Sequence, residues 1–216
     1  MTDILRYPTF SESWTRSVER RGDHSFLVFE DPNGVASNWT YSQFDDVVSQ
    51  VAGTLSSRGV VAGSAVHMAL ANSPAFVAVW LAVVRLGAWV VPSDPMGRAS
   101  EFEGHIRRTS PVVGICETSR SSAYLEACGS LSVIQVDEQD PDMPALLGDR
   151  FSSLLDIGPT DRAGVMFTSG TTGEPKGVEV TQANYAFAGR TMAEAACLDE
   201  TDRQLVVLPM FHVNAQ

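Results

Sequence analysis

Residues 63–92 read GSAVHMALANSPAFVAVWLAVVRLGAWVVP, with a longer apolar run between two shorter ones. The shorter runs, 65–70 and 88–91, have strand length and are almost wholly apolar, which is typical of strands buried on both faces. Between them, Ser73 and Pro74 form a helix start, with an N-cap side chain followed by proline at the first helical position. This strand–helix–strand unit predicts a parallel sheet covered by helices.

The same alternation continues on both sides of this unit. Capping boxes at Thr40–Gln43 and at Ser100–Glu103 predict two further helices, the first of them ending near Gly59. We also expect strands at 112–116, 133–136, 164–168, 178–180 and 205–209, and helices at 121–127 and 182–197. The fold class is therefore predicted to be α/β, with a mainly parallel sheet through residue 136 and helices on both faces.

The composition is that of a globular domain: 216 residues, of which 44% are hydrophobic and 19% charged. This balance excludes a disordered chain or a coiled coil. The net charge of −11 argues against a nucleic-acid partner or binding to an acidic membrane surface. The most apolar stretch, 75–91, is interrupted by Arg85 and Gly87 and is too short to span a membrane.

Cysteine usage and the N-terminus bear on the compartment. The three cysteines, Cys116, Cys128 and Cys197, are widely spaced and form neither a disulfide framework nor a zinc motif. The first ten residues, MTDILRYPTF, lack the apolar core of a signal peptide. We therefore expect a cytoplasmic protein.

Residues 168–177 read TSGTTGEPKG and carry the strongest functional signal. Three glycines let backbone N–H groups turn toward an anion, four hydroxyls add donors, and Lys176 adds a positive charge. Lys176 is the only lysine in the chain. The loop is not a Walker A motif, because Pro175 and Gly177 occupy its second glycine and Ser/Thr positions. We favour phosphate binding over a polar surface linker, and expect the loop to join two antiparallel strands.

The loop, with Val178 after it, resembles the signature loop of the adenylate-forming superfamily, which includes acyl-CoA ligases, peptide-synthetase adenylation domains and luciferases. Three further segments resemble family motifs in the same order: Trp39-Thr40-Tyr41, residues 59–92, and the LPMFH of residues 208–212. The resemblance is greatest to small-acid CoA ligases of the carnitine/crotonobetaine type. It implies that ATP and Mg²⁺ activate a carboxylic acid as an acyl-adenylate, with release of pyrophosphate, before transfer to CoA.

The resemblance also assigns site residues. It places the triphosphate against the loop and Mg²⁺ near Thr168, with Lys176 and His212 as catalytic residues and His212 beside the acyl pocket. The triphosphate contacts are Thr168, Ser169, Gly170, Thr171, Thr172, Gly173 and Lys176. Outside these motifs, we interpret His24, His67 and His105 as structural or solvent-facing, and Arg107-Arg108 as a solvated helix face.

The sequence departs from the family pattern in length and at two positions. Gln182 follows Thr181 where the family often has histidine, and Phe167 stands where tyrosine is frequent. The family's later elements, including an acidic residue for Mg²⁺ and a C-terminal lysine, would lie beyond Gln216. Residues 1–216 are therefore expected to be an incomplete N-terminal AMP-binding domain, inactive by itself, with the apolar run 205–209 left uncovered.

Four interpretations stay open at this point. The first is CoA ligation of a carboxylic acid whose identity the sequence does not determine. The second is a diazotase that adenylates nitrite for reaction with an arylamine, since nitrite is also an oxyanion nucleophile. The third is an enzyme that loads an acid onto a carrier protein. The fourth is a non-catalytic, truncated nucleotide-binding module, which the intact loop with Lys176 disfavours.

Overall fold

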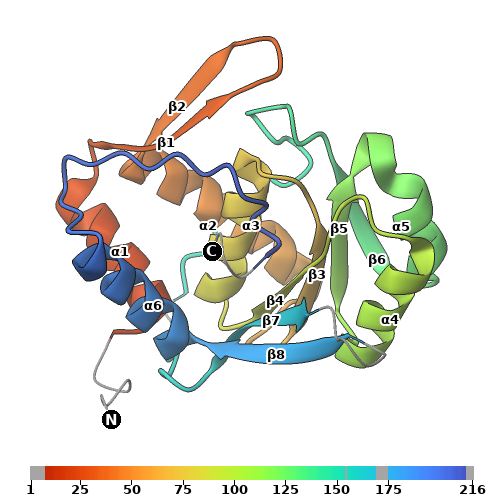
Figure 1. Ribbon diagram of the computed structural model, residues 1–216. Helices are drawn as coiled ribbons and strands as arrows, with labels where there is room; N and C mark the ends of the chain where they lie inside the picture. Colours follow the sequence, from red (N-terminus) through yellow and green to blue (C-terminus); the bar gives the residue numbers. More distant parts are fainter. Residues whose placement is uncertain (1–7, 154, 169–174, 213–216) are drawn as a thin grey trace.

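The computed structural model describes residues 8–153, 155–168 and 175–212. Its centre is a six-stranded sheet with the strand order β6-β5-β3-β4-β7-β8 (Figure 1). The first five strands in this order run parallel, and β8 runs antiparallel to β7. The strands are β3 Ala65–Ala69, β4 Trp89–Pro92, β5 Val113–Glu117, β6 Ser132–Val136, β7 Arg162–Thr168 and β8 Lys176–Thr181.

Helices cover both faces of this sheet, as Figure 1 shows. On one face, α2 (Tyr41–Ser57) packs on α3 (Pro74–Arg85), and α1 (Phe10–Arg21) lies against both and against α6 (Gln182–Ala195). On the other face, α4 (Ala99–Thr109) packs on α5 (Ser121–Cys128), which follows the short 3-10 turn Thr118–Arg120. The predicted α/β class, with a mainly parallel sheet between two helical layers, is confirmed.

The helix starts follow local side-chain chemistry, with one correction. The hydroxyl of Thr40 accepts from the N–H of Gln43 at 3.2 Å, and the hydroxyl of Ser73 accepts from the N–H of Phe76 at 3.2 Å. The predicted start at Ser100 is wrong by two residues. α4 begins two residues earlier because the carboxylate of Glu101 accepts from the backbone N–H of Arg98 at 2.8 Å.

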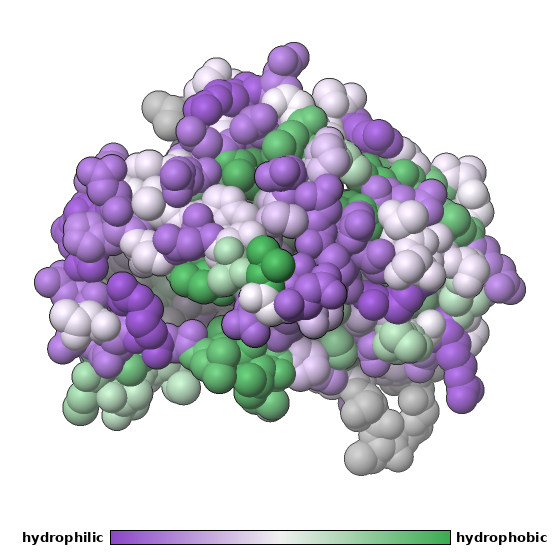
Figure 2. Space-filling model, turned by 90° about the horizontal axis from the view of Figure 1, so that it is seen from above, coloured by the Kyte–Doolittle hydropathy of each residue, from purple (hydrophilic) through white to green (hydrophobic). Residues whose placement is uncertain are grey.

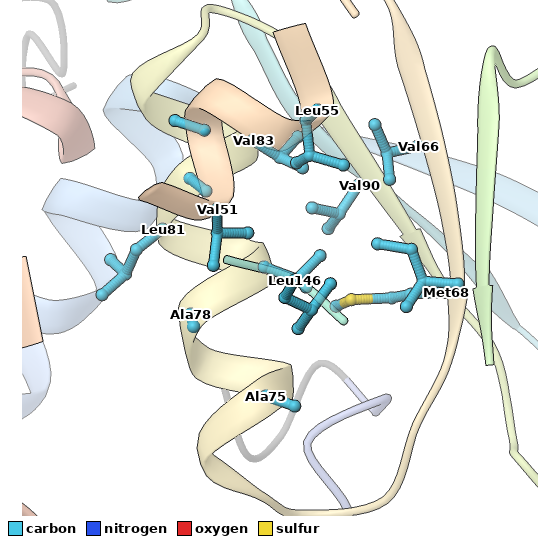
Figure 3. Packing of buried hydrophobic residues seen from close by; sticks show 14 of the residues in the cluster. Val51, Leu55, Val66, Met68, Ala75, Ala78, Leu81, Val83, Val90 and Leu146 are labelled. Atoms are coloured by element: carbon cyan, nitrogen blue, oxygen red, sulfur yellow. The ribbon is translucent and has the colours of Figure 1, made fainter. Parts of the chain in front are cut away.

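The largest apolar cluster lies between the sheet and the helices α2 and α3 (Figure 3). Val51 and Leu55 of α2 point toward Val66 and Met68 of β3, and Leu146 fills the space between them. All five side chains are fully buried. Full burial of a side chain of this size stabilises a fold by roughly 1.5–3 kcal/mol, so this cluster fixes the position of β3 and its neighbours.

The hairpin of β7 and β8 is the part of the fold that carries the glycine-rich loop. Its register pairs Met166 with Val178, Phe167 with Gly177 and Thr168 with Lys176. The predicted antiparallel pair is therefore confirmed, with both strands longer than expected. Because Gly177 lies within β8, the element after the loop is a strand, unlike the helix of a Walker fold.

Two parts of the structure differ from the sequence prediction. The N-terminal hairpin of β1 (Ser25–Glu30) and β2 (Ala36–Thr40), together with α1, was not predicted. The strand predicted at 205–209 is wrong: this segment is irregular, and Leu205 and Val207 are 87% and 73% exposed. A strand needs a neighbour, and in the described part of the chain none pairs with this segment.

Polar residues cover most of the surface visible in Figure 2. The face seen from above is mainly hydrophilic and is interrupted by separate hydrophobic patches (Figure 2). Within residues 8–153, 155–168 and 175–212, no helix combines the length and apolar character needed to cross a membrane.

Candidate functional site

A pocket of about 490 Å³ opens at the carboxyl ends of β4 and β7. Ligand sites in parallel α/β sheets lie at this edge, because the loops that follow the strands gather there. Helix α4 forms one wall, the mouth of the β7–β8 hairpin forms another, and the end of the described chain borders it. The residues that line it include Ser93, Glu101, His105, Arg108, Phe167, Thr168, Pro175 and His212.

Thr168 and Lys176 face each other across the mouth of the hairpin. They are register partners, and the hydroxyl of Thr168 donates to the backbone oxygen of Lys176 at 3.4 Å. Both residues are exposed, so the hydroxyl and the ammonium group are open to a ligand. The predicted phosphate contacts Ser169, Gly170, Thr171, Thr172 and Gly173 lie outside the described residues.

His212 lies on the margin of the same pocket, as an exposed side chain. Its backbone N–H donates to the oxygen of Pro209 at 3.0 Å, and its ring lies 4.8 Å from that of Phe211. Asn72, before α3, anchors the segment by donating to the oxygen of Leu208 at 2.9 Å and accepting from the N–H of Met210 at 2.8 Å. The structure thus brings His212 to the same pocket as Thr168.

His105 and Arg108 of α4 form a wall of the pocket that the sequence analysis missed. The ring of His105 stacks on Phe167 with centroids 4.0 Å apart, and the guanidinium of Arg108 lies 5.0 Å from the same ring centroid. Arg108 also donates to the backbone oxygen of Pro175. His105 is thus a packed residue at the pocket, and the exposed side chain of Arg108 also contacts the hairpin. Their three-residue spacing indicates a shared helix face, but only the packing of α4 selects Phe167 as partner.

A chain of hydrogen bonds runs from His105 into the core. The hydroxyl of Ser93 lies 2.8 Å from Nδ1 of His105 and 2.9 Å from Nε2 of His67, and Nδ1 of His67 lies 2.7 Å from the hydroxyl of Tyr124. His67 is fully buried, and this burial lowers its pKa to about 3. The prediction that His67 is structural agrees with this position, while His24 is exposed.

The single hydroxyl proton of Ser93 can be donated to only one of the two histidine rings at a time. With His67 neutral, Ser93 has one proton to donate, either to Nε2 of His67 or to Nδ1 of His105. Burial lowers the pKa of His105, the Glu101 carboxylate raises it and Arg108 lowers it further, with a net decrease. A proton gained by His105 would fix its Nδ1 as a donor, and Ser93 would then donate to His67.

The cysteines supply no nucleophile to this site. Burial raises the pKa of Cys116 to about 12 and that of Cys128 to about 11, so both thiols stay protonated near neutral pH. Cys197 is an exposed free thiol after α6 and is not among the residues that line the pocket.

The family resemblance implies Mg²⁺, so the site must offer oxygen donors that suit this ion. In the described part of the chain, no group of three or more His, Cys, Asp or Glu side chains could hold a metal ion. Mg²⁺ is usually held by one or two protein oxygens, substrate phosphates and water. The exposed hydroxyl of Thr168 fits such a partial role.

Comparison with known proteins places this geometry in a family. The profile of the AMP-binding enzyme family matches residues 14–216, which include the hairpin and the whole pocket. The chain belongs to the AMP-binding enzyme family. The prediction that it is similar to adenylate-forming enzymes is confirmed.

Curated relatives of this AMP-binding chain include two CoA ligases. The crotonobetaine/carnitine–CoA ligase of Salmonella paratyphi A is 27% identical over 228 residues, and that of Citrobacter koseri is 26% identical over 234 residues. Each alignment covers 99% of this chain and 44% of the relative. The chain thus spans less than half the length of these relatives.

Solved structures share the fold. MatB of Rhodopseudomonas palustris superposes with a TM-score of 0.81 at 22% identity, covering 95% of this chain and 41% of MatB. The same protein has also been solved with ATP bound, and that structure gives a TM-score of 0.80. VinN in complex with 3-methylaspartate gives 0.77 at 24% identity, over 92% of this chain and 54% of VinN. At these identities the likeness establishes the fold.

Proposed function

We propose that the full-length protein containing this chain activates a carboxylic acid with ATP as an acyl-adenylate and transfers the acyl group to CoA. The observation that carries the proposal is the hairpin mouth, where Thr168 and Lys176 face each other beside a pocket that His212 also borders. Membership of the AMP-binding family and the CoA-ligase relatives support it. In this proposal, residues 1–216 are an incomplete N-terminal AMP-binding domain.

In the first step, a carboxylate oxygen of the substrate attacks the α-phosphorus of ATP. The bond between the α-phosphorus and its bridging oxygen breaks, and pyrophosphate leaves with that electron pair. The ammonium of Lys176 stabilises the negative charge that develops on the leaving group. In this proposal, the hydroxyls and backbone N–H groups of residues 168–173 hold the triphosphate. The hydroxyl of Thr168 would be a ligand for Mg²⁺, which would neutralise part of the phosphate charge when bound.

In the second step, the thiolate of CoA attacks the acyl carbonyl, and AMP leaves. His212 borders the pocket. In this proposal it orients the substrate carboxylate in the first step. The pocket volume of about 490 Å³ lies within the usual range for small-molecule sites. The crotonobetaine/carnitine–CoA ligase relatives support a small acid as substrate. Since all three cysteines are free thiols, we place the protein in the cytoplasm.

ATP–pyrophosphate exchange by the full-length protein tests the first step. The panel contains crotonobetaine, carnitine, short aliphatic acids, aryl acids and nitrite, and each is assayed at saturating ATP and Mg²⁺. We expect exchange with one or more small carboxylic acids. Absence of exchange with every acid would overturn the proposal, and exchange with nitrite alone would replace it with nitrite adenylation.

A second assay tests the acceptor. With the acid that supports exchange, AMP release is measured with CoA, without any thiol, and with a carrier domain bearing a phosphopantetheine arm. We expect CoA to accelerate AMP release and to appear as a thioester. Acceleration by the carrier domain but not by CoA would show that the acceptor assignment is wrong.

A further inference from the structure

One face of α4 touches the end of β7 and the residue just before β8, at the open end of the hairpin. His105 and Arg108 are three residues apart, so their side chains lie on the same side of the helix. The ring of Phe167, near the end of β7, stacks on His105 and lies beneath the guanidinium of Arg108. On the opposite side of the hairpin mouth, Arg108 donates to the backbone oxygen of Pro175, the residue before β8.

These contacts lie directly beside the two groups that the proposed function places on phosphate. Phe167 precedes Thr168 in β7, and Pro175 precedes Lys176 at the start of β8. Thr168 and Lys176 are paired to each other in the hairpin register. A shift of either flanking residue would therefore move the hydroxyl of Thr168 or the ammonium of Lys176.

The wall that makes these contacts is itself fixed from the core. Nδ1 of His105 is held at 2.8 Å by the hydroxyl of Ser93, which also lies 2.9 Å from the buried ring of His67. His67 continues the chain to the hydroxyl of Tyr124 at 2.7 Å. The His105 ring is therefore held by Ser93, which follows β4, and Ser93 is held in turn by groups on β3 and α5.

We propose that His105 and Arg108 are positioning residues that hold Phe167 and Pro175, and through them Thr168 and Lys176, in the geometry needed for departure of pyrophosphate. The inference rests on the proposed function and adds a role for α4. A positioning role differs from a purely structural one because the two side chains would change the rate of adenylation by way of Lys176. A misplacement of about 1 Å at a reacting centre costs about 100-fold in rate.

The main test is a double-mutant cycle in the full-length protein, with ATP–pyrophosphate exchange as the readout. We expect Arg108→Ala to lower kcat about 10- to 100-fold, with a smaller change in the KM for ATP. In a Lys176→Ala background, the same substitution should cost less than about 3-fold, because the group it positions is already gone. An equal loss in both backgrounds would overturn the inference, since Arg108 would then act independently of Lys176.

A matched control addresses charge and folding. Arg108 and Arg150 are both exposed, but Arg150 contacts Asp46 and is not a pocket residue. Arg150→Ala should exchange pyrophosphate at the wild-type rate. Thermal melting of both variants should stay close to wild type, and an unfolded Arg108→Ala protein would assign the residue to stability and overturn the inference.

A second pair of variants separates ring stacking from the Ser93 hydrogen bond. His105→Phe keeps an aromatic ring beside Phe167, whereas His105→Leu does not. We expect the phenylalanine variant to recover most of the activity that the leucine variant loses. Equal loss in both would contradict a role for the stack.

The exchange assays distinguish failure of the positioning role from failure of the proposed function. If the wild-type protein exchanges pyrophosphate and Lys176→Ala does so slowly, while the Arg108 and His105 variants match the wild type, only the inference fails. If the wild-type protein exchanges with no acid in the panel, the proposed function fails and the inference fails with it.

Discussion

The imidazole ring of His105 lies nearly parallel to the phenyl ring of Phe167, with centroids 4.0 Å apart and planes inclined by 10°. His105 belongs to α4 and Phe167 to the carboxyl end of β7, so the stack joins a helical wall to the hairpin. Aromatic pairs contribute about 0.5–1.5 kcal/mol beyond their buried area. Together with the bond from Arg108 to Pro175, the stack attaches the end of β7 and the residue before β8 to one helix.

Lys176→Ala in the full-length enzyme should slow adenylation strongly and leave the fold intact. One charge-assisted contact to a leaving group in a water-poor site contributes on the order of 2–4 kcal/mol, or about 30- to 1000-fold in rate. Lys176 is exposed, so its removal should change stability by no more than about 0.5 kcal/mol. Pyrophosphate exchange at saturating substrate and thermal melting measure the two effects.

Lys176→Arg is the matching conservative variant. It should restore little of the rate, because a broad planar guanidinium does not replace a compact ammonium next to Thr168. Exchange at the wild-type rate by Lys176→Ala would return residues 168–177 to the linker interpretation. A large decrease in melting temperature would make the lysine structural.

Gly114→Ala should destabilise the sheet next to the buried tyrosine. A Cβ at Gly114 would lie 2.7 Å from the hydroxyl of Tyr124, closer than van der Waals contact allows. The hydroxyl cannot move away without cost, because it is also hydrogen-bonded to Nδ1 of His67 at 2.7 Å. Overpacking of this kind costs about 1–3 kcal/mol, which thermal melting should detect as a lower midpoint.

Gly189→Ala provides the control for the glycine substitution. Gly189 is an exposed position within α6, and a Cβ there would meet no atom within 4 Å. Alanine should stabilise this helix by about 0.5–1 kcal/mol. A loss of stability at Gly189 that equals the loss at Gly114 would remove the steric explanation.

Local signals made much of the fold predictable from the sequence. The hydroxyls of Thr40 and Ser73 accept backbone N–H groups at the starts of α2 and α3, where the sequence predicts helices. The apolar runs became β3 and β4, because continuous apolar strands are buried on both faces of a parallel sheet. Each of these features depends on residues close together in the chain.

Features that depend on distant contacts were not predictable in this way. Arg108 looked like a solvated residue, and only the docking of α4 on the hairpin brings it to Pro175. The segment 205–209 shows the reverse case: its apolar composition indicates a buried strand, but this tendency does not supply a partner strand. Leu208 in this segment and the adjacent Met210 bond instead to the side chain of Asn72, and the oxygen of Pro209 accepts from the N–H of His212.

Glu138→Leu should destabilise the protein strongly. Glu138 is 2% exposed, and its carboxylate accepts from the N–H of Ala71 at 2.9 Å and pairs with Arg120. Leucine would leave the N–H of Ala71 without this partner, which costs about 1–3 kcal/mol. It would also remove the ion-pair partner of Arg120, whose side chain is 33% exposed and can be hydrated. Glu194→Gln removes an exposed pair with Arg190 and should cost less than about 0.5 kcal/mol. Similar melting midpoints for the two variants would contradict a structural role for Glu138.

His67 should make the protein sensitive to acid. Burial lowers the pKa of His67 from 6.5 to about 3 in the folded state. Between these two values the unfolded chain binds more protons than the folded one, so stability falls as the pH falls. Each pH unit in this window costs up to about 1.4 kcal/mol for one such group.

His67→Gln tests this dependence, because glutamine donates and accepts hydrogen bonds but does not titrate. The variant should be less stable than the wild type at pH 7.5, since its bonds to Ser93 and Tyr124 will be less well placed. Its melting midpoint should then fall less between pH 7.5 and pH 5, although a slope from His105, whose pKa burial also lowers, will remain. His24 is exposed, so its ring lies in water in both states, and His24→Gln should show the wild-type slope. A slope for His67→Gln as steep as that of the wild type would show that His67 is not the group responsible for the loss of stability in acid.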